Sequence, residues 1–166
     1  MKLIDVLFLV ALVAAVLIIV AVVRQLLKRS NDFALLRERV HLQSDRYVFL
    51  IDRKFRVKET NYYELNADIR DDQPYVLGNV LHCQNAMDEG LCGTGINCDN
   101  CPIRVVIENA FKMKRDFDHV EAVMRLHDKN HKTVQVDVRA DGELVHVGKE
   151  PYFLVKLRKK PKQTTE

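Results

Sequence analysis

Four cysteines lie close together in the middle of the chain, and the rest of the sequence contains none. Cys83, Cys92, Cys98 and Cys101 follow the spacing C-x8-C-x5-C-x2-C. A C-x2-C pair places two thiolates on one metal centre from a single tight turn. Zinc and iron–sulfur clusters both accept four thiolate ligands. These four residues are therefore the predicted metal ligands, and the spacing leaves zinc and an iron–sulfur cluster both open.

The residues around the cysteines suit thiolate chemistry. Gly93 and Gly95 let the backbone wrap around a bound centre. Pro102 fits the first position of a helix, so the C-x2-C pair would lie at a helix N-terminus, whose partial positive charge favours thiolates. Arg104, one turn into that helix, could offset some of the negative charge of four thiolates. A thiol–disulfide switch without metal is the main alternative, and four cysteines with no shared role is a weaker one.

The N-terminal segment is apolar enough to be a membrane anchor. From Val6 to Val23, eighteen residues carry no charge and no polar side chain. With Leu3 and Ile4, this stretch reaches about the length needed to cross a ~30 Å hydrocarbon core. A cleaved signal peptide is the rival, but its apolar region is usually shorter, about 7–15 residues, and follows a more basic start. The prediction is a retained transmembrane helix over residues 1–23.

Basic residues after this segment predict its orientation. Arg24, Lys28 and Arg29 flank its C-terminal end, which places that end on the cytoplasmic side. The expected location is the cytoplasmic membrane, crossed once, with the C-terminal domain in the cytoplasm. Thiols are kept reduced there, so a cysteine cluster is expected to bind metal or to be redox-active. The formal net charge of +3 is small and gives no case for nucleic-acid binding.

Residues 24–46 predict a juxtamembrane linker helix. Leu26, Phe33, Val40 and Tyr47 recur every seven positions, which is a weak coiled-coil pattern. A solvated linker and a dimer-forming helix both fit this segment, so a homodimer is one of the expectations.

The remaining chain predicts an α+β domain with an antiparallel sheet and helices on one face. Apolar β-forming residues predict strands at 47–52 and 55–60, separated by a turn at 52–54. Irregular helical turns and loops follow over 61–81, and a helix begins at Pro102. Alternating patterns then predict strands at 119–126 and 133–140, with a hairpin turn at Asp141-Gly142. The segments 143–147 and 152–157 follow, either as two strands or as one interrupted strand.

The order of these segments resembles a PAS sensory domain. YVFLIDRKFRVKETN is similar to the opening of that domain, YVLGN to its central part, and VDVRADGELVHVGKEPYFLVKL to its closing hairpin. The pattern CG…C-x2-C-P-x-R before the long helix resembles a bacterial subgroup of PAS domains. The resemblance implies that residues 47–158 form a five-stranded antiparallel sheet cupping a cavity for a small molecule or cofactor, with a cysteine loop at 83–101.

The chain departs from this family after the last strand. Arg158, Lys159 and Lys160 stand where PAS domains often carry an acidic Asp-x-Thr motif, and residues 159–166 form a basic tail. No output domain follows, so the resemblance implies signalling to a separate protein. No catalytic motif is present, and no enzyme activity is expected. The predicted function is a membrane-tethered sensory module with a four-cysteine metal centre. The alternatives are a membrane-anchored iron–sulfur electron-transfer protein and a zinc-stapled interaction scaffold.

Overall fold

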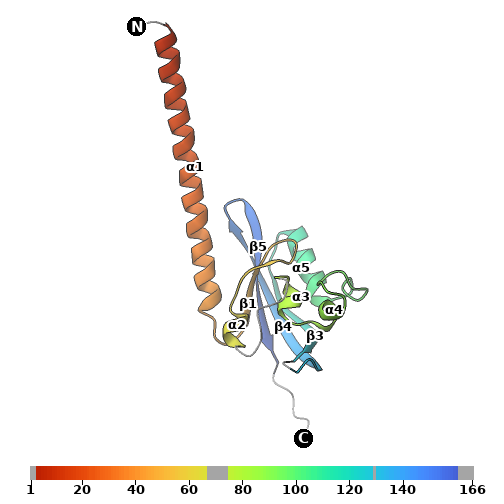
Figure 1. Ribbon diagram of the computed structural model, residues 1–166. Coiled ribbons are helices and arrows are strands. Elements are labelled where there is room, and N and C mark those ends of the chain that lie inside the picture. The colour runs from red at the N-terminus through yellow and green to blue at the C-terminus, as the bar shows by residue number, and fades with distance from the viewer. Residues whose placement is uncertain (1–2, 67–74, 129, 161–166) are drawn as a thin grey trace.

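A long helix leads into a five-stranded sheet that carries short helices on one face (Figure 1). The computed structural model describes residues 3–66, 75–128 and 130–160. Its helices are α1 (Leu3–His41), α2 (Tyr62–Leu65), α3 (Leu77–Val80), α4 (Gln84–Asp88) and α5 (Pro102–Met113). Its strands are β1 (Tyr47–Ile51), β2 (Val57–Thr60), β3 (Phe117–His127), β4 (Thr133–Val147) and β5 (Glu150–Lys159).

The strands form one sheet in the order β2-β1-β5-β4-β3, and every neighbouring pair is antiparallel. The first and last strands of the domain therefore lie side by side, with Phe49 of β1 opposite Val155 of β5. The predicted α+β class with a five-stranded antiparallel sheet is confirmed.

Each face of the sheet packs against helices. On the inner face, α5 contributes Ile107 and Phe111, and the Phe111 ring meets Phe153 of β5 edge-on at 4.6 Å between centroids. On the outer face, Leu36 and Val40 near the end of α1 pack against Val48, Leu50, Val145, Val147 and Leu154. Because both faces are covered, β1 is apolar without alternation.

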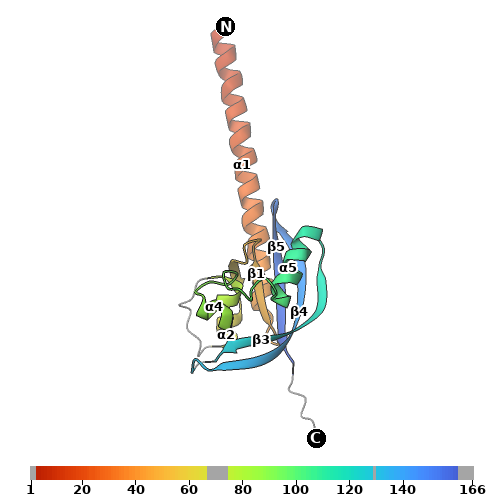
Figure 2. The same cartoon turned by 90° about the vertical axis from the view of Figure 1, so that its right-hand side faces the viewer.

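The N-terminal part of α1 stands clear of the domain, as both views show (Figures 1 and 2). The segment Phe8–His41 has the length and apolar composition of a membrane-spanning helix, with a mean hydropathy of 2.7 in its apolar window. None of that window is buried inside the protein. The predicted anchor and the predicted linker thus form one continuous helix.

The sevenfold repeat in α1 has a different role from the dimer seam that the sequence suggested. Phe33 and Val40 pack on the outer face of the sheet, and Tyr47 already belongs to β1. Only Leu26, at 60% exposure, stays free of the domain. The apolar positions of this segment are spaced to meet the protein's own sheet, so they give no support to a homodimer.

The hairpin turn predicted at Asp141-Gly142 is wrong. β4 continues through both residues, and the chain turns at Gly148 and Lys149, where Gly148 has φ +63°. Gly142 serves packing instead: the Phe117 ring of the neighbouring strand lies so close to it that a β-carbon would collide with the ring.

The second strand begins two residues later than expected. Phe55 has a positive φ of 61° and ends the turn after β1. In that turn, a carboxylate oxygen of Asp52 accepts the backbone N–H groups of Lys54 at 2.9 Å and Arg56 at 3.0 Å. The predicted basic tail begins at the last residue of β5, Lys159, and residues 161–166 lie outside the described part of the chain.

Candidate metal centre

The four cysteines come from three turns that face the inner side of the sheet. Cys83 immediately precedes α4, Cys92 and Cys98 lie in the loop that follows it, and Cys101 caps the N-terminus of α5. All four line one cavity of about 40 Å³, and Cys98 is the most buried at 5% exposure. The other lining residues are Phe55, Leu77, Gly78, Leu81, Asn85, Ala86, Ile103, Arg104 and Met124. The cysteine loop therefore closes one end of the domain core.

The sulfurs share this cavity without forming a tight cluster. Within residues 3–66, 75–128 and 130–160, no three cysteine sulfurs lie within 4.8 Å of one another. A tetrahedral zinc site with about 2.3 Å bonds holds its sulfurs about 3.8 Å apart. The structure thus brings the predicted ligands to the same cavity, but their spacing is wider than a single zinc ion requires.

Burial and backbone N–H groups act in opposite directions on two of the thiols. Burial is the largest influence and raises the pKa of Cys83 and of Cys92. The N–H groups of Asn85 and Ala86 at the start of α4 lower the pKa of Cys83, and that of Gly78 lowers the pKa of Cys92. Both thiols are therefore protonated at neutral pH, and metal binding would have to release their protons.

Asn79 is a positioning residue that the cysteine pattern did not reveal. It is 1% exposed, and its side-chain oxygen accepts the backbone N–H of Cys92 at 2.8 Å. Its side-chain nitrogen donates to the carbonyl oxygen of Gly90 at 3.1 Å. Both bonds hold the loop that carries Cys92. Asn79 follows the Leu-Gly pair of YVLGN, so the segment that resembled a PAS motif already contained it.

Arg104 lies beside the cysteine loop, as its place in the sequence suggested. Its guanidinium lies over the Phe55 ring at 4.7 Å from the centroid, and its Nε is 2.9 Å from a carboxylate oxygen of Glu108. Gly93, with φ +99°, leaves the space that this guanidinium occupies. The positive charge of Arg104 also lowers the pKa of Cys92, although burial outweighs it. Arg104 is therefore placed to stabilise negative charge on the cysteine loop.

A second group of potential ligands appears only in the folded chain. Asp118, His119 and Asp141 have ligand atoms within 4.8 Å of one another. The His119 Nδ1 lies 2.8 Å from an Asp118 oxygen, and the His119 backbone N–H donates to Asp141 at 2.9 Å. The first two side chains are exposed, and these contacts account for the arrangement where β3 and β4 change register. No sequence spacing predicts this group, because the strands bring distant residues together.

The comparisons with known proteins support the fold and say nothing of the cysteines. No family model matches the chain, and no curated protein matches it. The crystal structure of the Escherichia coli DhaR(N)–DhaL complex matches with a TM-score of 0.52 at 14% identity. That match covers 95% of this chain and 46% of the other, so this chain spans about half the length of the protein it matches.

A PAS domain from Desulfitobacterium hafniense also matches, with a TM-score of 0.36 at 14% identity. That match covers 70% of this chain and 93% of the PAS domain. At such identities the likeness concerns the fold alone. The likeness to the DhaR(N) structure shows a shared fold. The sheet order and the helical layer on its inner face agree with the five-stranded antiparallel sheet that the sequence led us to expect.

Proposed function

We propose that the protein is a membrane-tethered regulatory module whose PAS-like domain holds a metal centre on Cys83, Cys92, Cys98 and Cys101. The observation that carries the proposal is the shared cavity: four thiols from three turns face one small, largely apolar space. Four unpaired thiols in one cavity form a complete ligand set for a metal centre. We expect this function to be regulatory; apart from Asn85 and Arg104, the residues that line the cavity beside the thiols are apolar or glycine.

The chemistry of the cavity fits an iron–sulfur cluster better than a single zinc ion. In a [4Fe–4S] cluster each thiolate binds a different iron atom, which separates the cysteine sulfurs more widely than tetrahedral zinc does. The wide spacing of the cysteine sulfurs agrees with this. The backbone N–H groups of Asn85 and Ala86 interact with the Cys83 sulfur, and that of Gly78 interacts with the Cys92 sulfur. Hydrogen bonds to the cysteine sulfurs help to set the reduction potential of an iron–sulfur cluster. When bound, the cluster would supply sensitivity to oxidants.

The cysteine loop is connected to both faces of the domain. Cys101 caps α5, and the backbone N–H of Val105 donates to its carbonyl oxygen at 2.9 Å, so a change in the loop would act on the start of that helix. Helix α5 packs against the inner face of the sheet, whose outer face holds the end of α1. A loop that is ordered with metal and loosened without it is a suitable two-state element for signalling.

The membrane tether and the separate partner are parts of the same proposal. The side chains of α1 from residue 8 to residue 23 are all exposed. A long apolar helix that the protein itself does not bury supports the tether. The similar DhaR(N) structure was solved as a complex with DhaL. This supports signalling through another protein that binds the surface of the domain.

The deciding experiment is a metal analysis of the full-length chain purified in detergent without oxygen. We expect a brown protein that contains iron and acid-labile sulfide and loses both colour and iron in air. Cys98→Ser should reduce the iron content several-fold, because it removes one of four ligands. Asp99→Ala is the matched control: the residue is exposed in the same turn, and its loss should leave the iron content unchanged.

Two other results would change the proposal. One equivalent of zinc in a colourless protein would indicate that the metal only stabilises the structure of the loop. A folded protein that binds neither metal under these conditions, and in which all four thiols react alike, would contradict a metal centre. An iron–sulfur centre that cycles through repeated oxidation and reduction without loss would favour the electron-transfer alternative over the sensor.

A further inference from the structure

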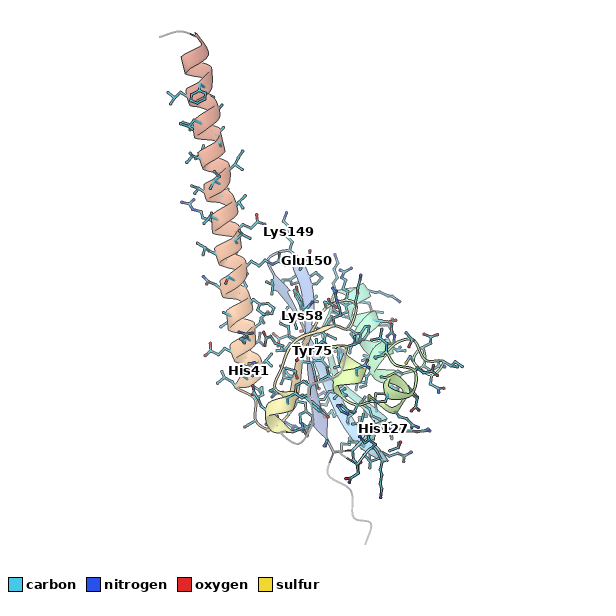
Figure 3. All side chains as sticks on the ribbon, in the orientation of Figure 1. His41, Lys58, Tyr75, His127, Lys149 and Glu150 are labelled. Atoms are coloured by element: carbon cyan, nitrogen blue, oxygen red, sulfur yellow. The ribbon has the colours of Figure 1, made fainter. Side chains whose placement is uncertain are left out.

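The hairpin between β4 and β5 reaches along α1 toward the end of its apolar segment (Figure 1). A groove of about 870 Å³ separates the two elements. One side of this groove is formed by α1 from Gln25 to Arg39, and the other by the hairpin tip, residues 145–150. Lys149 and Glu150 at the tip lie beside α1 (Figure 3). The hairpin tip and the juxtamembrane turns of α1 are therefore at the same height.

That height coincides with the expected membrane surface. Gln25, which lines the groove, follows Val23, the last residue of the uninterrupted apolar segment, by two positions. At about 1.5 Å per residue this is about 3 Å along the helix axis. The polar headgroup region on each side of a bilayer is about 5–7 Å thick. With Val23 at the edge of the hydrocarbon core, the hairpin tip meets the headgroup region.

Four basic side chains at this height have no carboxylate partner in the part of the chain that the structure describes. Arg24, Lys28 and Arg29 of α1 and Lys149 of the tip are exposed. Among the described residues, none of these four has a carboxylate within 4.0 Å. The cations farther along α1 differ. Arg37 pairs with Glu59 at 2.7 Å and Arg39 with Glu143 at 2.7 Å.

The contrast along α1 suggests what the unpaired cations bind. Glu150 is the only acidic residue of the tip, and Asp32 lies deeper in the groove. Four Lys and Arg side chains near one surface attract an anionic leaflet, and the attraction falls off within a Debye length, about 8 Å at physiological salt. The cations closest to the apolar segment are thus the ones left available to lipid.

We propose that the β4–β5 hairpin tip is a second membrane contact, at which Lys149 joins Arg24, Lys28 and Arg29 in binding the phosphate groups of anionic lipids. This inference rests on the proposed membrane tether. The helix and the tip together hold the domain at two points, which limits its rotation about α1. The opposite end of the sheet, where β3 turns into β4, then faces the cytoplasm.

Fluorescence quenching in nanodiscs tests the contact, because the chain has no tryptophan and one can be introduced as a unique probe. His146→Trp places it on the exposed side of the hairpin near the tip and keeps Lys149 and Glu150. Lys132→Trp, at the far end of the sheet, is the matched control. Ala15→Trp, in the apolar segment, reports the tether itself. Far-UV circular dichroism checks that each full-length variant is folded.

The nanodiscs contain phosphatidylcholine with or without phosphatidylglycerol, and a nitroxide on either the headgroup or the acyl chain. We expect the probe at position 146 to be quenched by the headgroup nitroxide about twofold more with phosphatidylglycerol than without it. Lys149→Glu or about 0.5 M salt should remove this difference. The probe at position 132 should show no quenching in either lipid.

The results separate the hairpin contact from the tether. Quenching at position 15 by the acyl-chain nitroxide, combined with lipid-independent fluorescence at position 146, would reject the hairpin contact and keep the tether. An unquenched probe at position 15 would reject both. A lipid-dependent signal at position 146 that persists in Lys149→Glu would reject the role of Lys149.

Discussion

Gly78 and Cys92 are in direct contact: a β-carbon added to Gly78 would lie 2.6 Å from the Cys92 sulfur. Gly78 is buried in α3, and its backbone N–H interacts with the same sulfur. The absence of a side chain at this position therefore decides where the second cysteine of the set lies. Two predictions on the metal centre follow from the residues that hold Cys92.

Gly78→Ala should displace the Cys92 sulfur and lower the metal content by about half or more, because the Cys92 side chain already fills the space that the methyl group needs. Iron, sulfide and zinc analysis of the anaerobically purified protein measures the effect. Asp99→Ala is the control, since this residue is exposed in the cysteine loop. Equal metal content in both variants would show that Cys92 is not a ligand in its present place.

Asn79→Ala should loosen the cysteine loop and speed up metal loss to a chelator several-fold. It removes the acceptor of the Cys92 N–H and the donor to the Gly90 carbonyl. The free energy of unfolding should decrease by about 1–3 kcal/mol, because buried backbone groups lose their hydrogen-bond partners. The measurements are a chelator time course and urea unfolding. Asn97→Ala, exposed in the same loop, should change neither.

Asn61→Ala should destabilise the junction between α1 and the sheet by about 2–4 kcal/mol. The Asn61 side chain is fully buried, accepts the Val48 N–H at 2.7 Å, and donates to the carbonyl oxygens of Gln43 at 2.7 Å and Arg46 at 3.0 Å. Urea unfolding measures the loss. Gln43→Ala keeps its carbonyl group and should cost far less; an equal cost would contradict the role of Asn61.

Asp45 should titrate far below its ordinary pKa of 3.8. Hydrogen bonds from Arg46, with a smaller contribution from Arg158, lower the pKa of Asp45 to about 2. Because the folded pKa is below the unfolded one, this stabilisation is complete above about pH 4 and is lost as the pH falls through about 2. A carboxylate titration by NMR measures the midpoint. In Arg46→Gln it should rise toward 3.8, whereas a wild-type midpoint near 3.8 would contradict the ion pair.

The double variant Ala15→Arg with Ile18→Arg should move the protein from the membrane fraction to the soluble fraction. Each arginine near the centre of a spanning helix costs about 2.5–3.5 kcal/mol. The domain should remain folded, since both residues are exposed and far from Leu36 and Val40. Carbonate extraction and immunoblotting measure the distribution. Leu35→Arg, beyond the apolar segment, should stay in the membrane fraction; release of both variants would argue for peripheral attachment.

Local patterns were sufficient for most elements. The strand pattern of Val134, Val136 and Val138 and the helix start at Pro102 needed only their neighbours in sequence, and the structure confirms both. The turn at Asp141-Gly142 failed for a non-local reason. The dipeptide suits a hairpin turn. In the folded chain, however, Gly142 lies between strands, opposite Val155 of β5 and under the Phe117 ring of β3, and β4 is extended through it.

The sequence by itself determined the class of the fold, the apolar N-terminal helix and the identity of the candidate ligands, because hydrophobic periodicity and cysteine spacing are local properties. Only the tertiary structure decided that all four thiols face one cavity, that Gly78 and Asn79 place Cys92, and that the heptad positions of α1 cover the protein's own sheet. It also brought the hairpin tip to the height of Lys28. These relationships join residues that are far apart in the chain. Their distances are set by side-chain packing, which cannot be read from spacing along the sequence.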